Sequence, residues 1–420
     1  MTQIDSRIKI KRSSNTGAVP TLAPSSDNRD GTWSVDDIYP GELYLNDPDG
    51  RLWIGTTTGV IEVAVGSTSG IADTPFVYGS TAGGALIYTS IQPDFGTVEI
   101  DAPYSSILGG NLNSILGATG AIYNSIVGGQ NNDIVNTTAS HKWNSILGGR
   151  NNTITSSYGA SNLGGQGSDI TSSNYGISGG RVNKLITSPH ALAIGGRYNT
   201  ITNSTDSSIL GGYGNKIYGG GNSSFIGNGS NNKIHTTGNY NVITGGYYNA
   251  ITVDSEKSVI VGGIYHTLDS SELSFIGGGY LNKLFKANHC TIVGGRYNYI
   301  NIGGLADQQY NFIGGGNLNI IAPLSDNCTI VGGVSNNTGG YDNVHIIGSN
   351  ITATAADTTY VENLDIENVA LFGEYTVATL PTASSFQGGL IMVTDETGGY
   401  VPAFSDGTNW RRVTDRVIVS

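Results

Sequence analysis

The stretch WNSILGGRNNTI, residues 143–154, is a phrase that recurs along most of the chain. Each copy has a short apolar pair, two glycines, two variable residues, a polar residue that is usually Asn, one further residue and an Ile or Leu. We take the first glycine of each copy as its marker: Gly109, Gly128, Gly148, Gly164, Gly179, Gly195, Gly211, Gly227, Gly245, Gly262, Gly277, Gly294, Gly314, Gly332 and Gly348. The period of about sixteen to seventeen residues is typical of a solenoid.

The chemistry of the phrase indicates strands. Helical repeats need apolar residues three and four apart and few glycines, whereas these units are rich in Ile, Val, Ser, Thr and Asn. We expect one strand on ILGG, one on NxI, and a corner at the glycines. Stacking would place each Ile above the last and the Asn side chains in an axial ladder. The prediction is an all-β parallel β-helix or β-roll of about fifteen coils, about 70 Å long at about 4.8 Å per coil.

So thin a coil predicts self-association, because each strand places only one or two apolar residues inside. The GG-x-x-N-x-I coils resemble the head repeats of trimeric adhesins and the shafts of phage tail fibres, over about 250 of 420 residues. Both are trimeric β-rolls, so the resemblance implies a homotrimer. The adhesin period is shorter and its motif differs, so only the architecture is carried over.

Composition limits the function classes. Charged residues are 12% of the chain, glycines number 63 and the formal net charge is −12. The acidic excess lies outside residues 101–350, and a neutral shaft with acidic ends argues against nucleic acid as a partner. No apolar stretch reaches 18 residues and the N-terminus lacks an apolar signal core, so we expect neither membrane insertion nor a signal peptide.

Five segments are predicted: 1–75, 76–103, 104–349, 350–378 and 379–420. The first combines the strand RIKIK, residues 7–11, with the hairpin GELYLNDPDGRLWIG, residues 41–55. It resembles the N-terminal module of phage tail fibre and receptor-binding proteins, which starts the trimer and attaches it to the virion. The resemblance implies attachment to tail or baseplate proteins, with Arg7, Lys9 and Lys11 as candidate attachment residues. Residues 76–103 would be a capping connector, 104–349 the repetitive shaft and 350–378 an acidic closing segment.

Residues 379–420 predict a small β knob with strands LIMVTD, VPAFSD and NWRRVTD. The stretch GGYVPAFSDGTNWRRVTD resembles a C-terminal module of phage tail proteins. Trp410, Arg411 and Arg412 are candidate receptor contacts, because Trp and Arg are common in binding hot spots. The alternative is that Trp410 is the core of the knob.

The sequence gives little indication of a disulfide, a metal site or catalytic carboxylates. Cys290 and Cys328 both precede TIVGG two coils apart, too far for a disulfide, and are expected to be reduced and buried. Calcium-binding nonapeptide repeats need an Asp that the phrase lacks, and the histidines form no close pair. The nearest acidic pairs, Asp254 with Glu256 and Asp269 with Glu272, lie in linkers. We therefore expect no catalytic residues, no metal and no cofactor.

A row of Tyr and Arg follows the glycines from about the sixth coil onward: Arg197, Tyr198, Tyr213, Tyr247, Tyr248, Tyr265, Tyr280, Arg296 and Tyr297. Its candidate receptor-binding residues are Tyr247, Tyr248, Tyr280, Arg296 and Tyr297. The same residue types pack well between subunits, and we expect the trimer seam here, with a receptor-facing stripe as the alternative.

The function expected from these features is a structural and host-recognition fibre of a phage tail or a phage-derived injection particle. It would assemble in the host cytoplasm, join the virion by its N-terminus and bind a cell-surface glycan or protein with its distal part. The rivals are a trimeric bacterial surface adhesin and a tailspike that cleaves polysaccharide. Sparse carboxylates disfavour the tailspike hydrolase.

Overall fold

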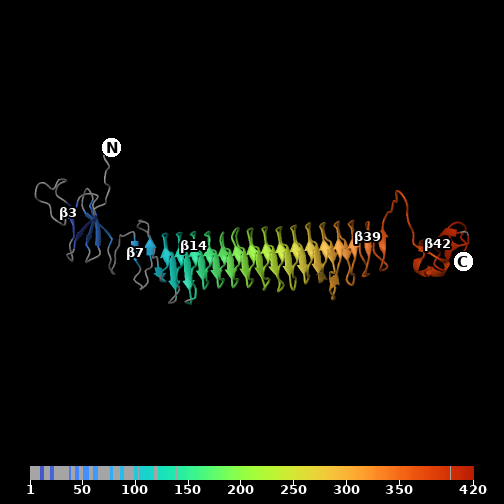
Figure 1. The fold of residues 1–420 in the computed structure, drawn as a ribbon, viewed down its shortest axis with the longest axis horizontal. Helices are drawn as coiled ribbons and strands as arrows, with labels where there is room; N and C mark the ends of the chain where they lie inside the picture. Colours follow the sequence, from blue (N-terminus) through green and yellow to red (C-terminus); the bar gives the residue numbers. More distant parts are fainter. Residues whose placement is uncertain are drawn as a thin grey trace, which may run out of the picture. The chain divides into compact units, whose positions relative to one another are not determined.

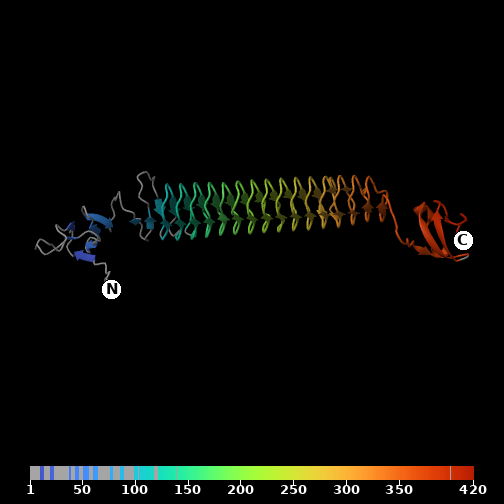
Figure 2. The ribbon, with the colours of Figure 1, turned by 90° about the horizontal axis from the view of Figure 1, so that it is seen from above.

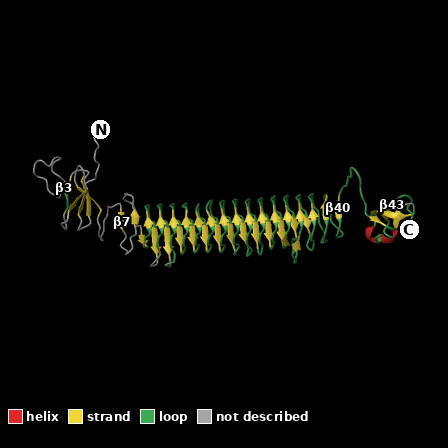
Figure 3. Cartoon of the chain, in the orientation of Figure 1, coloured by secondary structure: helices red, strands yellow, loops and turns green. Residues whose placement is uncertain are grey.

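The computed structural model describes residues 10–13, 19–22, 37–38, 43–46, 51–55, 60–64, 76–78, 86–88, 99–102, 104–117, 122–138, 140–397 and 399–420. These form two compact units, Met1–Tyr360 and Val361–Ser420. The first unit contains a parallel β-solenoid of about 17 turns, and helix is almost absent from the described residues. Figure 1 shows the coils of the solenoid stacked in chain order, and Figure 3 shows each coil contributing short strands joined by loops.

Two ladders of parallel strands run along the solenoid, and Figure 2 shows them from above. The first, here called the ILGG sheet, contains β8 (Leu86–Tyr88), β10 (Ser106–Ile107), β12 (Ser125–Ile126), β14 (Ser145–Ile146), β16 (Ser161–Asn162), β18 (Ile177–Ser178), β20 (Leu192–Ala193), β22 (Ser208–Ile209), β24 (Phe225–Ile226), β26 (Val242–Ile243), β28 (Val259–Ile260), β30 (Phe275–Ile276), β33 (Thr291–Ile292), β36 (Phe312–Ile313), β38 (Thr329–Ile330) and β39 (His345–Ile347). The second, the Asn sheet, contains β9 (Glu99–Asp101), β11 (Ser114–Gly117), β13 (Asp133–Asn136), β15 (Thr153–Thr155), β17 (Asp169–Thr171), β19 (Lys184–Ile186), β21 (Thr200–Thr202), β23 (Lys216–Tyr218), β25 (Lys233–His235), β27 (Ala250–Thr252), β29 (Thr267–Asp269), β31 (Lys283–Phe285), β34 (Tyr299–Ile300) and β37 (Ile320–Ile321).

The core is built from stacked isoleucines. Ile126 pairs with Ile146 in the ILGG sheet, and Ile134 pairs with Ile154 in the Asn sheet. All four are fully buried. The predicted parallel stacking of one Ile above the last is confirmed. Of the apolar pair in each phrase only the first residue faces inward, because side chains alternate along a strand; Leu147 beside Ile146 is 54% exposed.

The strand register corrects three of the glycine markers. Ile226, Ile276 and Ile313 align with the other core isoleucines, which places Gly227, Gly277 and Gly314 one residue before the marker position. Each of these glycines follows a Phe-Ile pair. A Cβ on it would lie 2.2 to 2.5 Å from a carbonyl oxygen of the next coil and 3.2 to 3.4 Å from the Phe ring. The glycine is therefore required chiefly by the close approach of the next coil's backbone, with the Phe ring packed beside it.

The corner depends on the second glycine of the pair. Gly149 has φ +86°, and a Cβ there would lie 2.2 Å from the carbonyl oxygen of Gly165 in the next coil. Two residues further on, the backbone is again left-handed, although most coils carry a side chain there: Val182 has φ +56° and Tyr248 has φ +54°. This conformation costs a non-glycine residue about 1–2 kcal/mol, so the coils that carry a side chain at this position are strained there, whereas those with Gly167 and Gly214 are not.

The N-terminal strands agree with the predicted hairpin. β4 (Leu43–Asn46), β5 (Arg51–Gly55) and β6 (Val60–Ala64) pair antiparallel in order, and β1 (Ile10–Ser13) pairs parallel with β4. β2 (Thr21–Leu22) pairs with β3 (Asp37–Ile38). The segment predicted as a connector, 76–103, contributes coil strands, because β8 and β9 pair in parallel with β10 and β11; β7 (Phe76–Tyr78) pairs antiparallel with β8.

The remaining strands lie near the C-terminal end of the solenoid and in the second unit. β32 (Ala287–Asn288) pairs with β35 (Gln308–Gln309), and β40 (Thr359–Val361) follows the last coils. In the second unit, β41 (Glu374–Tyr375), β42 (Leu390–Glu396), β43 (Gly399–Ser405) and β44 (Trp410–Arg412) form one sheet, with 3-10 helices at Val377–Thr379 and Ala383–Phe386. The three strands predicted between 379 and 420 lie on β42, β43 and β44.

Candidate functional site

An axial ladder of asparagines holds the glycine corners together. Asn249 is typical: its Nδ2 donates to the carbonyl oxygens of Gly245 and Gly263, both at 3.0 Å, and its Oδ1 accepts the backbone N–H of His266 at 3.0 Å. Each side chain thus bonds within its own coil and to the next. The column runs through Asn183, Asn199, Asn215, Asn232, Asn249, His266, Asn282, Asn298, Asn319 and Asn336. The predicted Asn ladder is confirmed.

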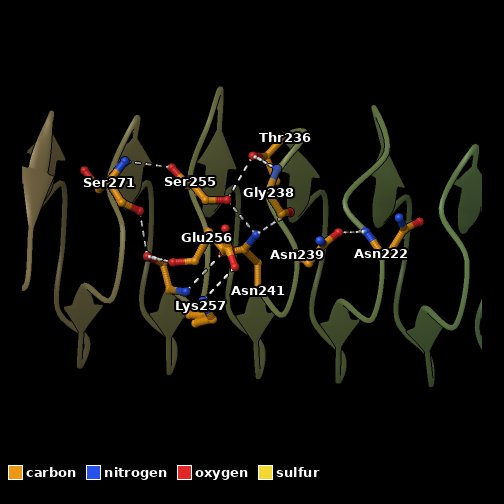
Figure 4. Close-up of polar contacts among 10 residues, drawn as sticks. Asn222, Thr236, Gly238, Asn239, Asn241, Ser255, Glu256, Lys257 and Ser271 are labelled. Atoms are coloured by element: carbon orange, nitrogen blue, oxygen red, sulfur yellow. Dashed lines mark hydrogen bonds and ion pairs between the residues drawn. The ribbon is translucent and has the colours of Figure 1, made fainter.

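A second polar column lies at the corner before the ILGG strands, and Figure 4 shows part of it. Asn241 Nδ2 donates to the carbonyl oxygens of Gly238 (2.9 Å) and Ser255 (2.8 Å), and Thr236 Oγ1 donates to the same Ser255 oxygen at 2.9 Å. Beside them Lys257 pairs with Glu256 at 2.8 Å. These groups satisfy one another, so this corner is structural.

Both cysteines belong to that second column. The backbone N–H groups of Asn311 and Val344 each donate to a cysteine Sγ at 3.4 Å, where other coils offer an Asn or Ser oxygen. Cys290 and Cys328 are buried and free, and the Asn311 coil lies between them as predicted. Burial raises the pKa of Cys290 to about 12, which makes it an inert acceptor.

His266 is the exception in the Asn ladder. Its ring is fully buried, and its Nδ1 accepts the backbone N–H of Asn282 at 3.1 Å. An accepting Nδ1 requires the neutral tautomer with the proton on Nε2, and burial lowers the pKa of His266 below its ordinary value. A proton on Nδ1 would break the ladder at this coil.

The tyrosine row predicted as a receptor or seam site lies along one corner of the solenoid. Ring centroids are 4.5 Å apart for Tyr247 and Tyr248, 6.2 Å for Tyr265 and Tyr280, and 5.5 Å for Tyr280 and Tyr297. These rings are exposed or half-buried. The structure therefore brings together the five predicted shaft residues, with Arg296 donating from Nε to Asn317 Oδ1 at 3.1 Å.

A second aromatic row, which we did not predict from the sequence, lies at the opposite end of the shaft. Consecutive centroids lie 5.2 to 6.2 Å apart through Tyr104, Tyr123, Trp143, Tyr158, Tyr175 and His190. The first pairs are stacked, so neighbouring rings already cover their faces, which suits a stabilising ladder. The signal was an aromatic residue two to three positions before the ILGG strand in successive copies.

A third row is apolar and outward-facing. The residue that follows the inward-facing core residue of each ILGG strand forms what we call the apolar ridge. In ten of the fifteen coils from β10 to β39 it is apolar and between 39% and 54% exposed: Leu108, Val127, Leu147, Leu163, Ile194, Leu210, Val261, Val293, Val331 and Ile347. In the other five coils it is Gly179, Gly227, Thr244, Gly277 or Gly314. In the ILGG sheet from β10 to β39, the positions on either side of each core residue carry no Asp, Glu, Lys or Arg. The ridge was predictable from strand alternation, which exposes one residue of any adjacent pair.

The knob candidates are largely engaged within their own unit. Trp410 is 5% exposed and its Nε1 donates to the carbonyl oxygen of Pro381 at 2.6 Å, so it belongs to the core of this unit. Arg411 pairs with Asp406, and holds the pKa of that carboxyl down to about 2. Arg412 contacts Asp415 at 2.7 Å and Glu396 at 3.6 Å. A ligand at these arginines would compete with their ion pairs.

The predicted attachment residues lie partly outside the described chain, and the acidic residues of one predicted pair are engaged with their neighbours. Arg7 and Lys9 lie outside the described residues, and Lys11 lies on β1. Asp254 accepts a hydrogen bond from Thr237 at 2.7 Å, and Glu256 is paired with Lys257. Within the described part of the chain, no three His, Cys, Asp or Glu side chains gather as a metal site.

No protein-family model and no curated protein matches the chain. Among the described residues, no helix has the length and hydropathy to cross a membrane.

Proposed function

We propose that the protein is a homotrimeric fibre of a phage tail or phage-derived injection particle, joined to the particle by its N-terminal segment and recognising a host cell surface. The apolar ridge carries this proposal. A row without charge along the solenoid, with an exposed apolar side chain in ten of fifteen coils and Gly or Thr in the others, is typical of an interface rather than of a free surface.

The occupant that fits the ridge is a second copy of the same chain. About 17 turns at about 4.8 Å span about 80 Å, and a strip about 10 Å wide then offers about 800 Å² per partner, the area of a standard interface. Only another repeat of the same coil spacing could match the ridge along its length. We therefore propose the ILGG sheet as the seam. The sequence predicted the seam on the tyrosine row, which this proposal leaves free for recognition.

Three copies are proposed because of the resemblance to trimeric β-rolls. Gel filtration of the full chain with light scattering should give about three times the chain mass of 43.7 kDa. A folded monomer at micromolar concentration would contradict the proposal.

The direction of attachment has its own test. Particles assembled with a chain lacking residues 1–75 should carry no fibre, whereas substitutions in the tyrosine row should leave assembly intact and reduce adsorption to cells. Normal incorporation of the shortened chain would show that attachment lies elsewhere.

A further inference from the structure

One section of the solenoid is basic although the chain as a whole is acidic. Residues 181–233 contain five Lys or Arg residues and a single acidic one, Asp206, against a net charge of −12 overall. Asp206 contacts His190 at 3.8 Å. The basic residues of this section are Arg181, Lys184, Arg197, Lys216 and Lys233.

The strand register gathers these cations on neighbouring positions. Lys184, Thr200, Lys216 and Lys233 occupy equivalent outward positions of four successive coils in the Asn sheet. Arg181 and Arg197 occupy the bridging position just before the left-handed residue of their coils. Five positive side chains therefore line one corner over four coils, about 15 Å of axial rise.

A shallow hollow opens between them. It has a volume of about 320 Å³ and is lined by Lys184, Tyr198, Thr200, Tyr213, Gly214 and Lys216, among others. Gly214 stands in the left-handed column where the previous coil has Tyr198, and a Cβ on it would lie 2.6 Å from Asn231 Oδ1. The Asn231 side chain of the next coil, which also lines the hollow, lies against Gly214 in the space that a side chain there would enter.

The charges of the hollow are poorly compensated. Lys184 lies 3.5 Å from Asp169, but neither Lys216 nor Arg197 forms an ion pair with another described residue. Arg197 lies over the Tyr213 ring at 4.9 Å, and Tyr198 meets Tyr213 edge to face at 5.6 Å. An edge-to-face pair leaves the faces of one ring uncovered by the other.

We propose that this hollow, here called the cationic groove, binds an acidic polysaccharide lying along the solenoid. Tyr198 and Tyr213 would pack against sugar rings. Lys184 and Lys216, which line the hollow, and Arg197, which lies beside it over the Tyr213 ring, would contact carboxylate, sulfate or phosphate groups. The cations are one or two coils apart, about 5–10 Å, which suits a polymer with one charge per one or two sugars. A nucleic acid strand carries a phosphate about every 3.4 Å, a density that these five cations do not match.

This inference deepens the proposed host recognition and rests on it in naming a cell-surface polymer as the ligand. Binding itself is measured on the purified full chain with two acidic probes, polygalacturonate and dextran sulfate. Their uncharged counterparts, fully methyl-esterified pectin and dextran, and poly-dT serve as comparisons. The wild-type chain should bind at least one acidic polysaccharide, more weakly at high salt, and neither uncharged one.

Two variants, K184E/K216E and Tyr213→Ala, test where the polymer binds, and K283E is the control. K184E/K216E should weaken binding at least tenfold, whereas K283E, at the equivalent outward position of a later coil, should bind as the wild type does. Tyr213→Ala should also weaken binding while the mass in solution stays unchanged. No binding to either acidic polymer, equal affinity of K184E/K216E and wild type, or tighter binding of poly-dT would overturn the proposal.

The two proposals fail in different ways. If the chain is monomeric but still binds the acidic polymer through Lys184 and Lys216, the fibre is wrong and the groove remains. If trimers adsorb to cells equally well with and without K184E/K216E, the fibre remains and the groove is not its receptor site.

Discussion

The apolar ridge and the corner bearing the tyrosine row and the cationic groove are carried by the same coils but differ in how they vary along the chain. The ridge carries no charge from Leu108 to Ile347 and is apolar in ten of its fifteen coils, with Gly or Thr in the other five. The corner changes from Arg and Lys around Lys184 to tyrosines in mostly edge-to-face contact after Tyr247. A repeated surface that stays constant suits self-association, because each coil must meet an identical coil. A surface that varies by section suits recognition of something that is not a repeat of the chain.

The largest effect should come from charging the ridge. Leu147→Asp together with Val261→Asp would place two carboxylates per copy in the proposed seam, where no partner charge is available. Light scattering should then give the mass of one chain, 43.7 kDa, or aggregates. The matched double variant, Tyr213→Ala with Tyr247→Ala on the corner of the solenoid, should remain a trimer. If the variant with the two ridge aspartates also remained a trimer, the proposed seam on the ridge would be wrong.

The next effect concerns the ladder beneath the glycine corner. Asn152 Nδ2 bonds the carbonyl oxygen of Gly148 at 2.9 Å, and its Oδ1 accepts the N–H of Ser168 at 3.0 Å. N152A leaves the carbonyl oxygen of Gly148 and the N–H of Ser168 without this hydrogen-bond partner and should lower the free energy of unfolding by about 2–4 kcal/mol. Thermal or denaturant unfolding measures the loss. T153A, an outward neighbour, should cost under about 0.5 kcal/mol, and equal losses would show that the ladder adds little.

A smaller effect depends on pH. Because the pKa of His266 is lower in the folded chain than its ordinary 6.5, the unfolded chain binds the proton first as pH falls. The stability due to neutral His266 is present above pH 6.5 and is lost as pH falls from there through the folded pKa. H266N restores the ladder residue and should flatten the dependence of the unfolding temperature between pH 7 and 5. Parallel curves for the two proteins would refute the assignment.

The smallest effect tests the left-handed column. Val182 has a β-branched side chain at φ +56°, which Gly or Asn would tolerate better. V182G and V182N should each raise the free energy of unfolding by about 1 kcal/mol, whereas V182A keeps the unfavourable conformation and should gain less. A loss of stability in both V182G and V182N would mean that packing of the Val182 methyls outweighs its backbone strain.

The sequence predicted the architecture because its signals were local. Gly-Gly, the following Asn and the paired Ile fix the corner, the ladder and the core of one coil, and repetition does the rest. The register at Gly227, Gly277 and Gly314 was misread, because the backbone of the next coil approaches these positions closely and requires an extra glycine, which the phrase alone does not reveal.

The candidate site was less accessible to prediction. Tyr247 and Tyr280 were found from residue type, and their alignment followed from the period. The groove was found only in part: Arg197, Tyr198 and Tyr213 belong to the predicted row, but Lys184 and Lys216 do not. Their in-register spacing is concealed by the uneven coil lengths. The ridge was overlooked because the pair Ile146 and Leu147 reads as one apolar unit, although the two side chains point to opposite sides of the sheet.

The most direct test of the account places a single cysteine on each surface of a chain carrying Cys290→Ser and Cys328→Ser. Val261→Cys lies on the apolar ridge and Tyr247→Cys on the tyrosine row. After mild oxidation, denaturing gels without reductant should show covalent dimers for V261C and only monomers for Y247C, since copies meet on the ILGG sheet. Crosslinked Y247C with unlinked V261C would place the seam on the tyrosine row and contradict the account.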